Sequence, residues 1–70
     1  MAENVLVKFG NRVREERKKQ KISQEALAEK AGVHRTYIGM VERAEKNITL
    51  NNIEKISKAL GLPISKLMDF

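Results

Sequence analysis

The sequence has 70 residues, the size of one small domain, and its 41% hydrophobic and 33% charged residues can form a core, which excludes a disordered chain. It contains no cysteine, which excludes disulfide scaffolds, cysteine zinc sites and thiol nucleophiles. The formal net charge of +5 favours a polyanionic partner, and half of the 14 lysines and arginines fall within residues 1–21.

The first predicted helix covers residues 4–19. Phe9 and Val13 lie four positions apart and are followed by good helix formers, which is typical of an amphipathic helix. Its other face is basic, so this helix would provide most of the general electrostatic attraction to a nucleic acid. A run of basic residues is equally often only a solvated helix face.

A second helix is predicted up to Ala31, with Ser23 as its N-cap and Gly32 at its end. Leu27 and Ala28 belong to its apolar stripe, together with Ala31. The short turn that follows contains a glycine and leads into another helix. This pattern is typical of a helix-turn-helix connection.

The third predicted helix covers residues 35–43 and directs Ile38 and Val41 towards the core. The residues left on faces that can point outwards are Arg35, Thr36, Gly39 and Met40.

A fourth helix is predicted after Thr49, which can cap it, and it ends at Gly61. Its predicted apolar ridge consists of Leu50, Ile53, Ile56 and Leu60. Pro63 then starts a short fifth helix. Strand signals are absent, so the predicted fold class is all-α.

The stretch SQEALAEKAGVHRTYIGMVER over residues 23–43 resembles the helix-turn-helix of the phage repressor, Cro and XRE family of DNA-binding proteins. The runs RTYI at 35–38, VER at 41–43 and NITL at 47–50 are similar to controller proteins of restriction-modification systems. The resemblance implies a compact five-helix, lambda-repressor-like DNA-binding domain over residues 1–70.

The resemblance also implies that the third helix enters the major groove of double-stranded DNA while the second crosses the phosphate backbone. The residues then expected to contact bases are Arg35, Thr36, Tyr37 and Met40. An arginine at the start of a recognition helix can donate two parallel hydrogen bonds to guanine. Tyr37 has the alternative of packing against the first helix.

Phosphate contacts are implied for polar residues at helix starts and in the loop after the third helix. They are Gln24, His34, Arg43, Lys46, Asn47, Asn51 and Asn52. Each has a purely structural alternative as a helix former, a helix cap or a solvated loop residue, and for His34 the cap is favoured. The family resemblance further implies a structural salt bridge between Arg17 and Glu42.

The C-terminal segment, about residues 60–70, is apolar for so small a chain. The family resemblance implies that it packs two subunits into a two-fold homodimer, which places two recognition helices about 34 Å apart. The expected interface residues are Leu62, Pro63, Ile64, Leu67, Met68 and Phe70. The alternative is that these residues close the core of the monomer.

Two positions depart from the family pattern, because Gln20-Lys21 and Ala44 stand where many relatives have glycine. A left-handed backbone at a residue other than glycine costs about 1 kcal/mol or more. Either these loops are shaped differently or the protein tolerates some strain.

An enzyme is disfavoured, because the chain has one histidine, no cysteine and no glycine-rich phosphate loop. Adjacent Glu15 and Glu16 would point about 100° apart on a helix and cannot form a cooperating carboxylate pair. We expect no cofactor, metal or small-molecule ligand. The sequence has no membrane-spanning segment or signal peptide pattern, so we expect a cytoplasmic protein.

The function implied by the resemblance is a transcriptional regulator that binds a palindromic or pseudo-palindromic operator as a homodimer. The controller subgroup implies an activator and autoregulator, with RNA polymerase as a candidate partner. One alternative is a phage-type or chromosomal XRE repressor. Another, of a different class, is an antitoxin or protein-interaction module that uses the same scaffold.

Overall fold

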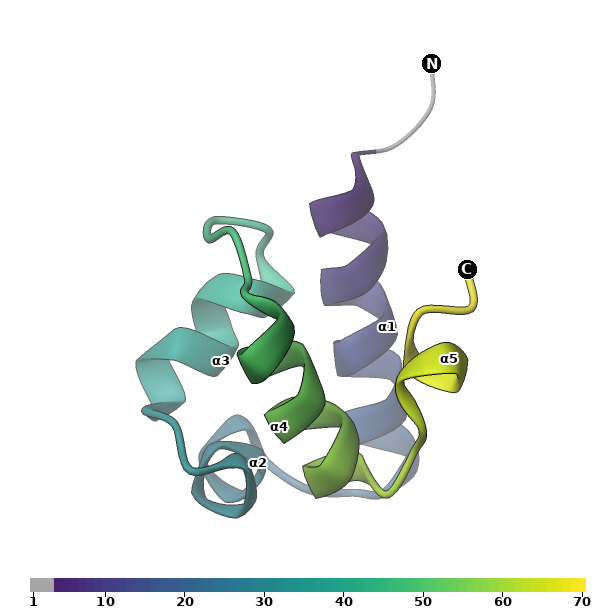
Figure 1. The fold of residues 1–70 in the computed structure, drawn as a ribbon. Helices are drawn as coiled ribbons and strands as arrows, with labels where there is room; N and C mark the ends of the chain where they lie inside the picture. The colour runs from purple at the N-terminus through teal and green to yellow at the C-terminus, as the bar shows by residue number, and fades with distance from the viewer. Residues whose placement is uncertain (1–3) are drawn as a thin grey trace.

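The computed structural model describes residues 4–70, so the first three residues of the N-terminal stretch, for which no signal peptide is expected, lie outside the described residues. Within this range the chain forms helices and no strand, which confirms the all-α prediction. The helices are α1 (Val5–Lys19), α2 (Gln24–Ala31), α3 (Arg35–Glu42), α4 (Leu50–Leu60) and α5 (Ile64–Leu67). Figure 1 shows α4 in front of α1, with α3 on one side and α5 on the other. No helix in this part of the chain is long and apolar enough to cross a membrane.

The helix starts are set by side chains that accept a hydrogen bond from the first turn. Ser23 accepts from the amide of Ala26 at 2.9 Å, and Thr49 accepts from the amide of Asn52 at 3.1 Å, which confirms both predicted caps. Gly32 and Gly61 end α2 and α4 with φ angles of 73° and 72°. α1 and α3 differ from the predicted ranges by one residue each, because Asn4 and Arg43 are caps.

One core gathers apolar side chains from all these helices. Its buried residues are Phe9, Val13, Leu27, Ala28, Ala31, Ile38, Val41, Ile53, Ile56, Leu60 and Leu67. Leu50 was predicted to join the apolar ridge of α4, but its side chain is 79% exposed, so that prediction is wrong. Leu50 is the first residue of α4.

α1 and the end of α3 approach each other closely at Gly10. A Cβ atom at this position would lie 2.5 Å from the carbonyl oxygen of Val41 and 2.9 Å from that of Glu42. Since both neighbours are backbone atoms, a side chain here would push the two helices apart. Gly10 therefore permits the contact on which the position of α3 depends.

Lys21 and Ala44 have positive φ angles, 57° and 59°. Of the two possibilities left open by the missing glycines, the structure therefore has the strained backbone. Both residues follow the C-terminal end of a helix, where glycine is the residue that adopts this conformation without strain.

Replacing Ala44 with glycine should raise the free energy of unfolding by about 1 kcal/mol, because the strain at φ 59° is removed. Urea denaturation and thermal unfolding measure the change. Ala59→Gly is the control, because Ala59 lies inside α4 and glycine there should cost about 1 kcal/mol. An unchanged or lowered melting temperature for Ala44→Gly would show that the turn is not strained.

Candidate nucleic-acid interface

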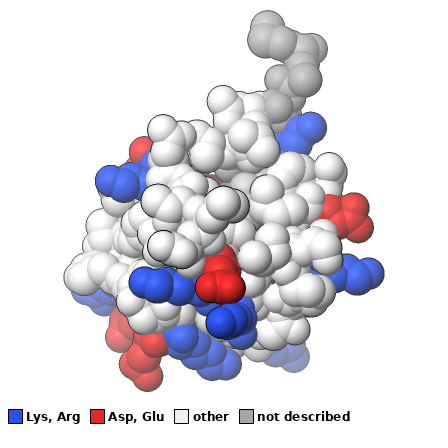
Figure 2. Space-filling model, in the orientation of Figure 1, with Lys and Arg blue, Asp and Glu red and all other residues white. Residues whose placement is uncertain are grey.

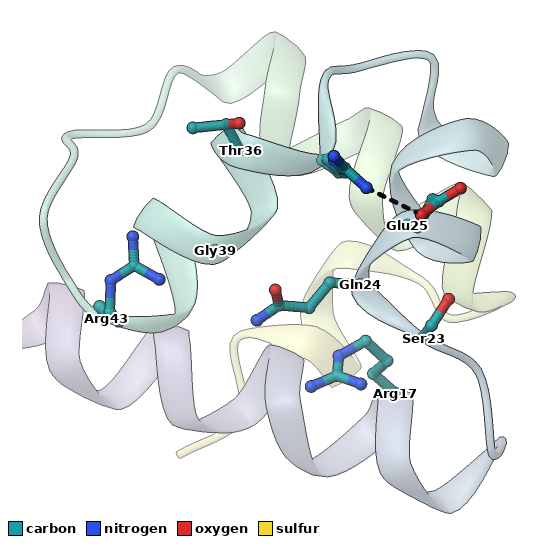
Figure 3. A pocket seen from close by; sticks show the side chains of 8 residues that line it. Arg17, Ser23, Gln24, Glu25, Thr36, Gly39 and Arg43 are labelled. Atoms are coloured by element: carbon teal, nitrogen blue, oxygen red, sulfur yellow. Dashed lines mark hydrogen bonds and ion pairs between the residues drawn. The ribbon is translucent and has the colours of Figure 1, made fainter.

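An open groove of about 690 Å³ lies between α1, α2 and α3 (Figure 3). The residues that line it are Arg17, Ser23, Gln24, Glu25, Arg35, Thr36, Gly39 and Arg43. The start of α2 and the outward side of α3 therefore share one surface. Arg35, Thr36, Gln24 and Arg43 were expected from the sequence to contact DNA, and the fold brings them together here.

Glu42, whose side chain is only 1% exposed, binds side chains from α1 and α2 beside the groove. Arg17 donates to both of its carboxylate oxygens, from Nε at 2.7 Å and from Nη2 at 3.1 Å, so the expected pair with Arg17 is present. Gln24 Nε2 donates to Oε1 at 3.1 Å. Arg14 lies 3.5 Å from the carboxylate and donates to the backbone carbonyl of Glu42 at 2.7 Å.

These contacts decide the charge state of Glu42. Burial acts to raise its pKa, but the hydrogen bonds from Arg17 and Gln24 and the positive charges of Arg17 and Arg14 outweigh it, so the pKa lies below the ordinary value of 4.5. The hydrogen bond to Glu42 raises the pKa of Arg17 in turn. Glu42 is therefore an ionised, fully paired anchor for the end of α3.

Two arginines remain at the surface of the groove, and each is paired with an acidic residue. Arg35 Nη1 lies 3.1 Å from Glu25 Oε2, and Arg43 Nε lies 3.1 Å from Glu45 Oε2. The hydrogen bond with Glu45 raises the pKa of Arg43. Both arginines are exposed and can exchange their carboxylate partners for other anions.

Gly39 lines the groove on the outward side of α3, as expected, but it is buried there. A Cβ atom there would lie 3.1 Å from Arg43 Nη1 and 3.6 Å from Gln24 Oε1. The side chains of those two residues extend over α3 at this point, so they cover the glycine. A larger residue would displace them from the groove.

Other expected base-contacting residues have different surroundings. Thr36 is exposed beside the groove, whereas Met40 is half-buried and does not line it. Tyr37 is half-buried against the core, and its hydroxyl accepts a hydrogen bond from Asn52 Nδ2 at 3.0 Å. The ring of Tyr37 therefore packs, as the structural alternative expected. Its contacts, however, are with the core and with α4.

Some of the residues expected to bind phosphate have partners within the protein, and others are exposed. His34 caps α3, because its Nδ1 accepts from the amide of Thr36 at 3.1 Å. Gln24 uses one amide hydrogen for Glu42, which leaves the other and the backbone N–H groups at the start of α2 for an anion. The exposed members around the loop after α3 and the start of α4 are Arg43, Lys46, Asn47 and Asn51.

The basic face of α1 differs from its sequence-based description. Arg14 and Arg17 bind Glu42, and Arg12 pairs with Glu15 and Glu16, so these arginines serve the fold. Figure 2 shows lysine and arginine side chains interspersed with acidic ones on the face of residues 4–70 that it presents. The arginines of this face are therefore engaged with carboxylates of the molecule itself.

The C-terminal segment is attached to α1 by two hydrogen bonds to backbone carbonyls. Arg12 Nη2 donates to Lys66 at 3.0 Å, and Gln20 Nε2 donates to Leu60 at 2.7 Å. Leu67 was predicted at a dimer interface, but it is fully buried in the core of the monomer, so that prediction is wrong. The alternative, in which the residue completes the monomer core, is correct for Leu67. Leu62 and Met68 are half-buried against the core, and the exposed members are Pro63, Ile64 and Phe70.

Sequence reasoning missed several residues that shape the site. Gly10, Arg14, Gln20 and Glu25 act through partners distant along the chain, from 10 residues for Glu25 to 40 for Gln20. Only Gly10 carried a local signal, as a glycine inside a predicted helix. Within residues 4–70 no group of three or more acidic or histidine side chains could hold a metal ion.

Comparison with known proteins agrees with this geometry. A helix-turn-helix family profile matches residues 13–67. Control protein C.BamHI of Bacillus amyloliquefaciens is 49% identical over 71 residues, which cover 100% of this chain and 88% of that protein. The crystal structure of the restriction-modification controller protein C.AhdI from Aeromonas hydrophila has a TM-score of 0.87 at 47% identity, over 89% of this chain and 94% of that chain. C.Esp1396I bound to a 25 base pair operator site has a TM-score of 0.87 at 29% identity, over 97% and 90%.

Replacing Glu42 with glutamine should lower the free energy of unfolding at neutral pH by about 3 kcal/mol, because Arg17, which is mostly buried, and Arg14 lose their buried counter-charge. The pKa of Glu42 is lowered by folding, so its contribution is complete above pH 4.5 and is lost as the pH falls through the folded-state value. Urea denaturation over a pH series should therefore show the difference between parent and variant shrinking below pH 4.5. Glu54→Gln, at an exposed glutamate of α4, is the control. Equal stability of Glu42→Gln and the parent would contradict the anchoring role.

Proposed function

The chain belongs to the Cro/C1-type helix-turn-helix family of DNA-binding transcription regulators and is similar to restriction-modification control proteins, and on that premise we propose that it binds a palindromic or pseudo-palindromic operator as a homodimer. The observation that carries the proposal is the groove in which exposed Arg35 and Thr36 stand beside the start of α2. The relative C.Esp1396I has been solved on a 25 base pair operator site with the same fold.

The proposed mode of binding places α3 in the major groove. Arg35 is the first residue of α3, and its guanidinium can donate two parallel hydrogen bonds to guanine O6 and N7. Thr36 can contact the next base through its hydroxyl or methyl group. Because Glu42 fixes the other end of α3, these side chains are presented from a rigid element.

Phosphate contacts would fix the register of the protein on the duplex. The first residues of α2, Gln24 and Glu25, line the groove together with Arg43, so the N-terminal N–H groups of α2, the second amide hydrogen of Gln24 and the guanidinium of Arg43 are the proposed phosphate donors. Lys46, Asn47 and Asn51 are exposed close by in the sequence. These contacts supply affinity and orientation without reading the sequence.

The dimer is proposed to form through the exposed part of the C-terminal segment, Pro63, Ile64 and Phe70. A two-fold axis through this surface would repeat α3 at about one turn of B-DNA, 34 Å. A palindromic operator is the DNA counterpart of that symmetry. In a controller protein such a dimer would act on its own promoter as an activator and autoregulator. RNA polymerase is a further proposed partner, and the proposed location is the cytoplasm.

The direct test is selection of bound sequences from a random duplex pool at two salt concentrations, with the mass of the protein in solution measured alongside. The proposal expects a symmetric site with half-sites about one helical turn apart and a dimeric mass. DNA binding through several phosphates should weaken steeply with salt. No enriched sequence, with only weak salt-sensitive binding, would overturn it and favour a protein-interaction module.

Base reading predicts different behaviour for the two groove arginines. Arg35→Ala should cost about 1 to 3 kcal/mol on the selected site and flatten the preference at one base pair, because its bidentate contact is lost. Arg43→Ala should weaken binding to all sequences alike and reduce the salt dependence, because it would remove a phosphate contact. Binding titrations on the site and its single-base variants measure both, and the opposite pattern would exchange the two roles.

The dimer surface is tested by Phe70→Glu, which should weaken self-association and operator binding together while helicity is retained, because Phe70 is exposed. Sedimentation and binding titrations measure the two effects. Val5→Glu, an equally simple change at an exposed apolar residue of α1, should leave both unchanged. Leu67→Glu is not a suitable probe, since it would bury a charge in the core. An unaltered mass and affinity of Phe70→Glu would refute this dimer surface.

A further inference from the structure

An acidic side chain stands beside the residue proposed to read bases. Glu25 Oε2 lies 3.1 Å from Arg35 Nη1, and Figure 3 draws this contact between α2 and α3. Both side chains are mostly exposed, 71% and 67%. A carboxylate on a surface proposed to bind phosphates weakens DNA binding by charge repulsion. We therefore ask what the contact of Glu25 with Arg35 contributes to DNA recognition.

The two residues are held by rigid elements on either side of the helix-turn-helix. Glu25 lies in the first turn of α2, whose start is fixed by the Ser23 cap. Arg35 is the first residue of α3, whose start is fixed by the His34 cap. Neither end of the contact therefore depends on a flexible loop.

The contact leaves Arg35 able to read a base. A guanidinium has five N–H donors, and the ion pair engages one nitrogen, Nη1. Guanine requires two parallel donors, which the remaining N–H groups can supply. A guanidinium already held at one nitrogen loses less side-chain freedom when it binds the base, and its direction is restricted before binding.

We infer that Glu25 is a positioning residue that sets the base preference of Arg35. The inference rests on the proposed function, because it concerns the same surface and the same DNA ligand. The charge of Glu25 repels phosphate and so lowers the affinity for DNA of any sequence. Its contact with Arg35 directs that side chain to one base pair and so raises the preference for that base pair.

Glu45 offers a matched comparison within the same surface. It pairs with Arg43 at 3.1 Å, and both side chains are 53% exposed, so its contact resembles that of Glu25 with Arg35. Arg43 is proposed to bind phosphate, which carries no sequence information. Glu25→Gln and Glu45→Gln therefore remove the same charge and the same kind of ion pair, but only the first concerns a base-reading arginine.

The experiment compares these variants on the operator selected by the parent protein, on its single-base variants and on random duplex DNA. Glu25→Gln should lower the preference at the base pair read by Arg35 about three- to five-fold, the effect of an exposed ion pair, while binding to random DNA becomes tighter. Glu45→Gln should tighten binding to random DNA and leave the preference unchanged. Glu25→Asp, which keeps the charge on a shorter side chain, should lower the preference without tightening binding to random DNA.

The Arg35→Ala background separates positioning from direct contact. There Glu25→Gln should have no further effect on the preference at that base pair. An effect that persists without Arg35, or that falls on another base pair, would mean that Glu25 contacts DNA itself and would overturn the inference. A parent-like profile for Glu25→Gln would also overturn it while leaving sequence-specific binding intact. A parent protein with no sequence preference would instead overturn the proposed function, so the two failures are distinct.

Discussion

The buried carboxylate of Glu42 joins α3 to α1 and α2, and the geometry of the groove depends on it. Arg17 and Arg14 reach it from α1, and Gln24 reaches it from α2. A buried charge is tolerated only when it is paired and hydrogen-bonded, so the three helices must keep these relative positions for the carboxylate to remain satisfied. The close approach at Gly10 allows α1 to come near enough for Arg14 to bind the backbone of Glu42 as well.

The distribution of charge shows why net charge is an incomplete guide to a binding surface. Three of the basic residues in the N-terminal part of the chain, Arg12, Arg14 and Arg17, hold helices together. At the groove, Arg35 and Arg43 are each paired with an acidic neighbour. Within the proposed function, the neighbouring carboxylates reduce binding of both arginines to phosphate in general, whereas a base can still be bound by the N–H groups of Arg35 that the ion pair with Glu25 does not engage.

The sequence predicts the parts of this structure that depend on near neighbours along the chain. Caps such as Ser23 and Thr49 and the buried positions of α2 follow from local chemistry and periodicity. Leu50 was misplaced, and the burial of Gly39 was not foreseen, because helical spacing defines a face without saying which other side chains reach it. Of the candidate site, the family resemblance supplied Arg35, Thr36 and the Arg17–Glu42 pair, whereas Glu25 could be connected with Arg35 only once α2 and α3 were placed.

α1 also carries the segment proposed for dimerisation. Gln20 binds the carbonyl at the end of α4, and Arg12 binds that of Lys66 in α5, so the C-terminal segment is attached to the same helix that anchors α3 through Glu42. The proposed dimer surface and the proposed recognition helix, α3, are thus both attached to α1. A fixed half-site spacing of about 34 Å requires that the two recognition helices do not move independently of the dimer axis. In the proposed dimer, α1 would meet that requirement through three of its arginines, Arg12, Arg14 and Arg17, which contact α5 and the end of α3.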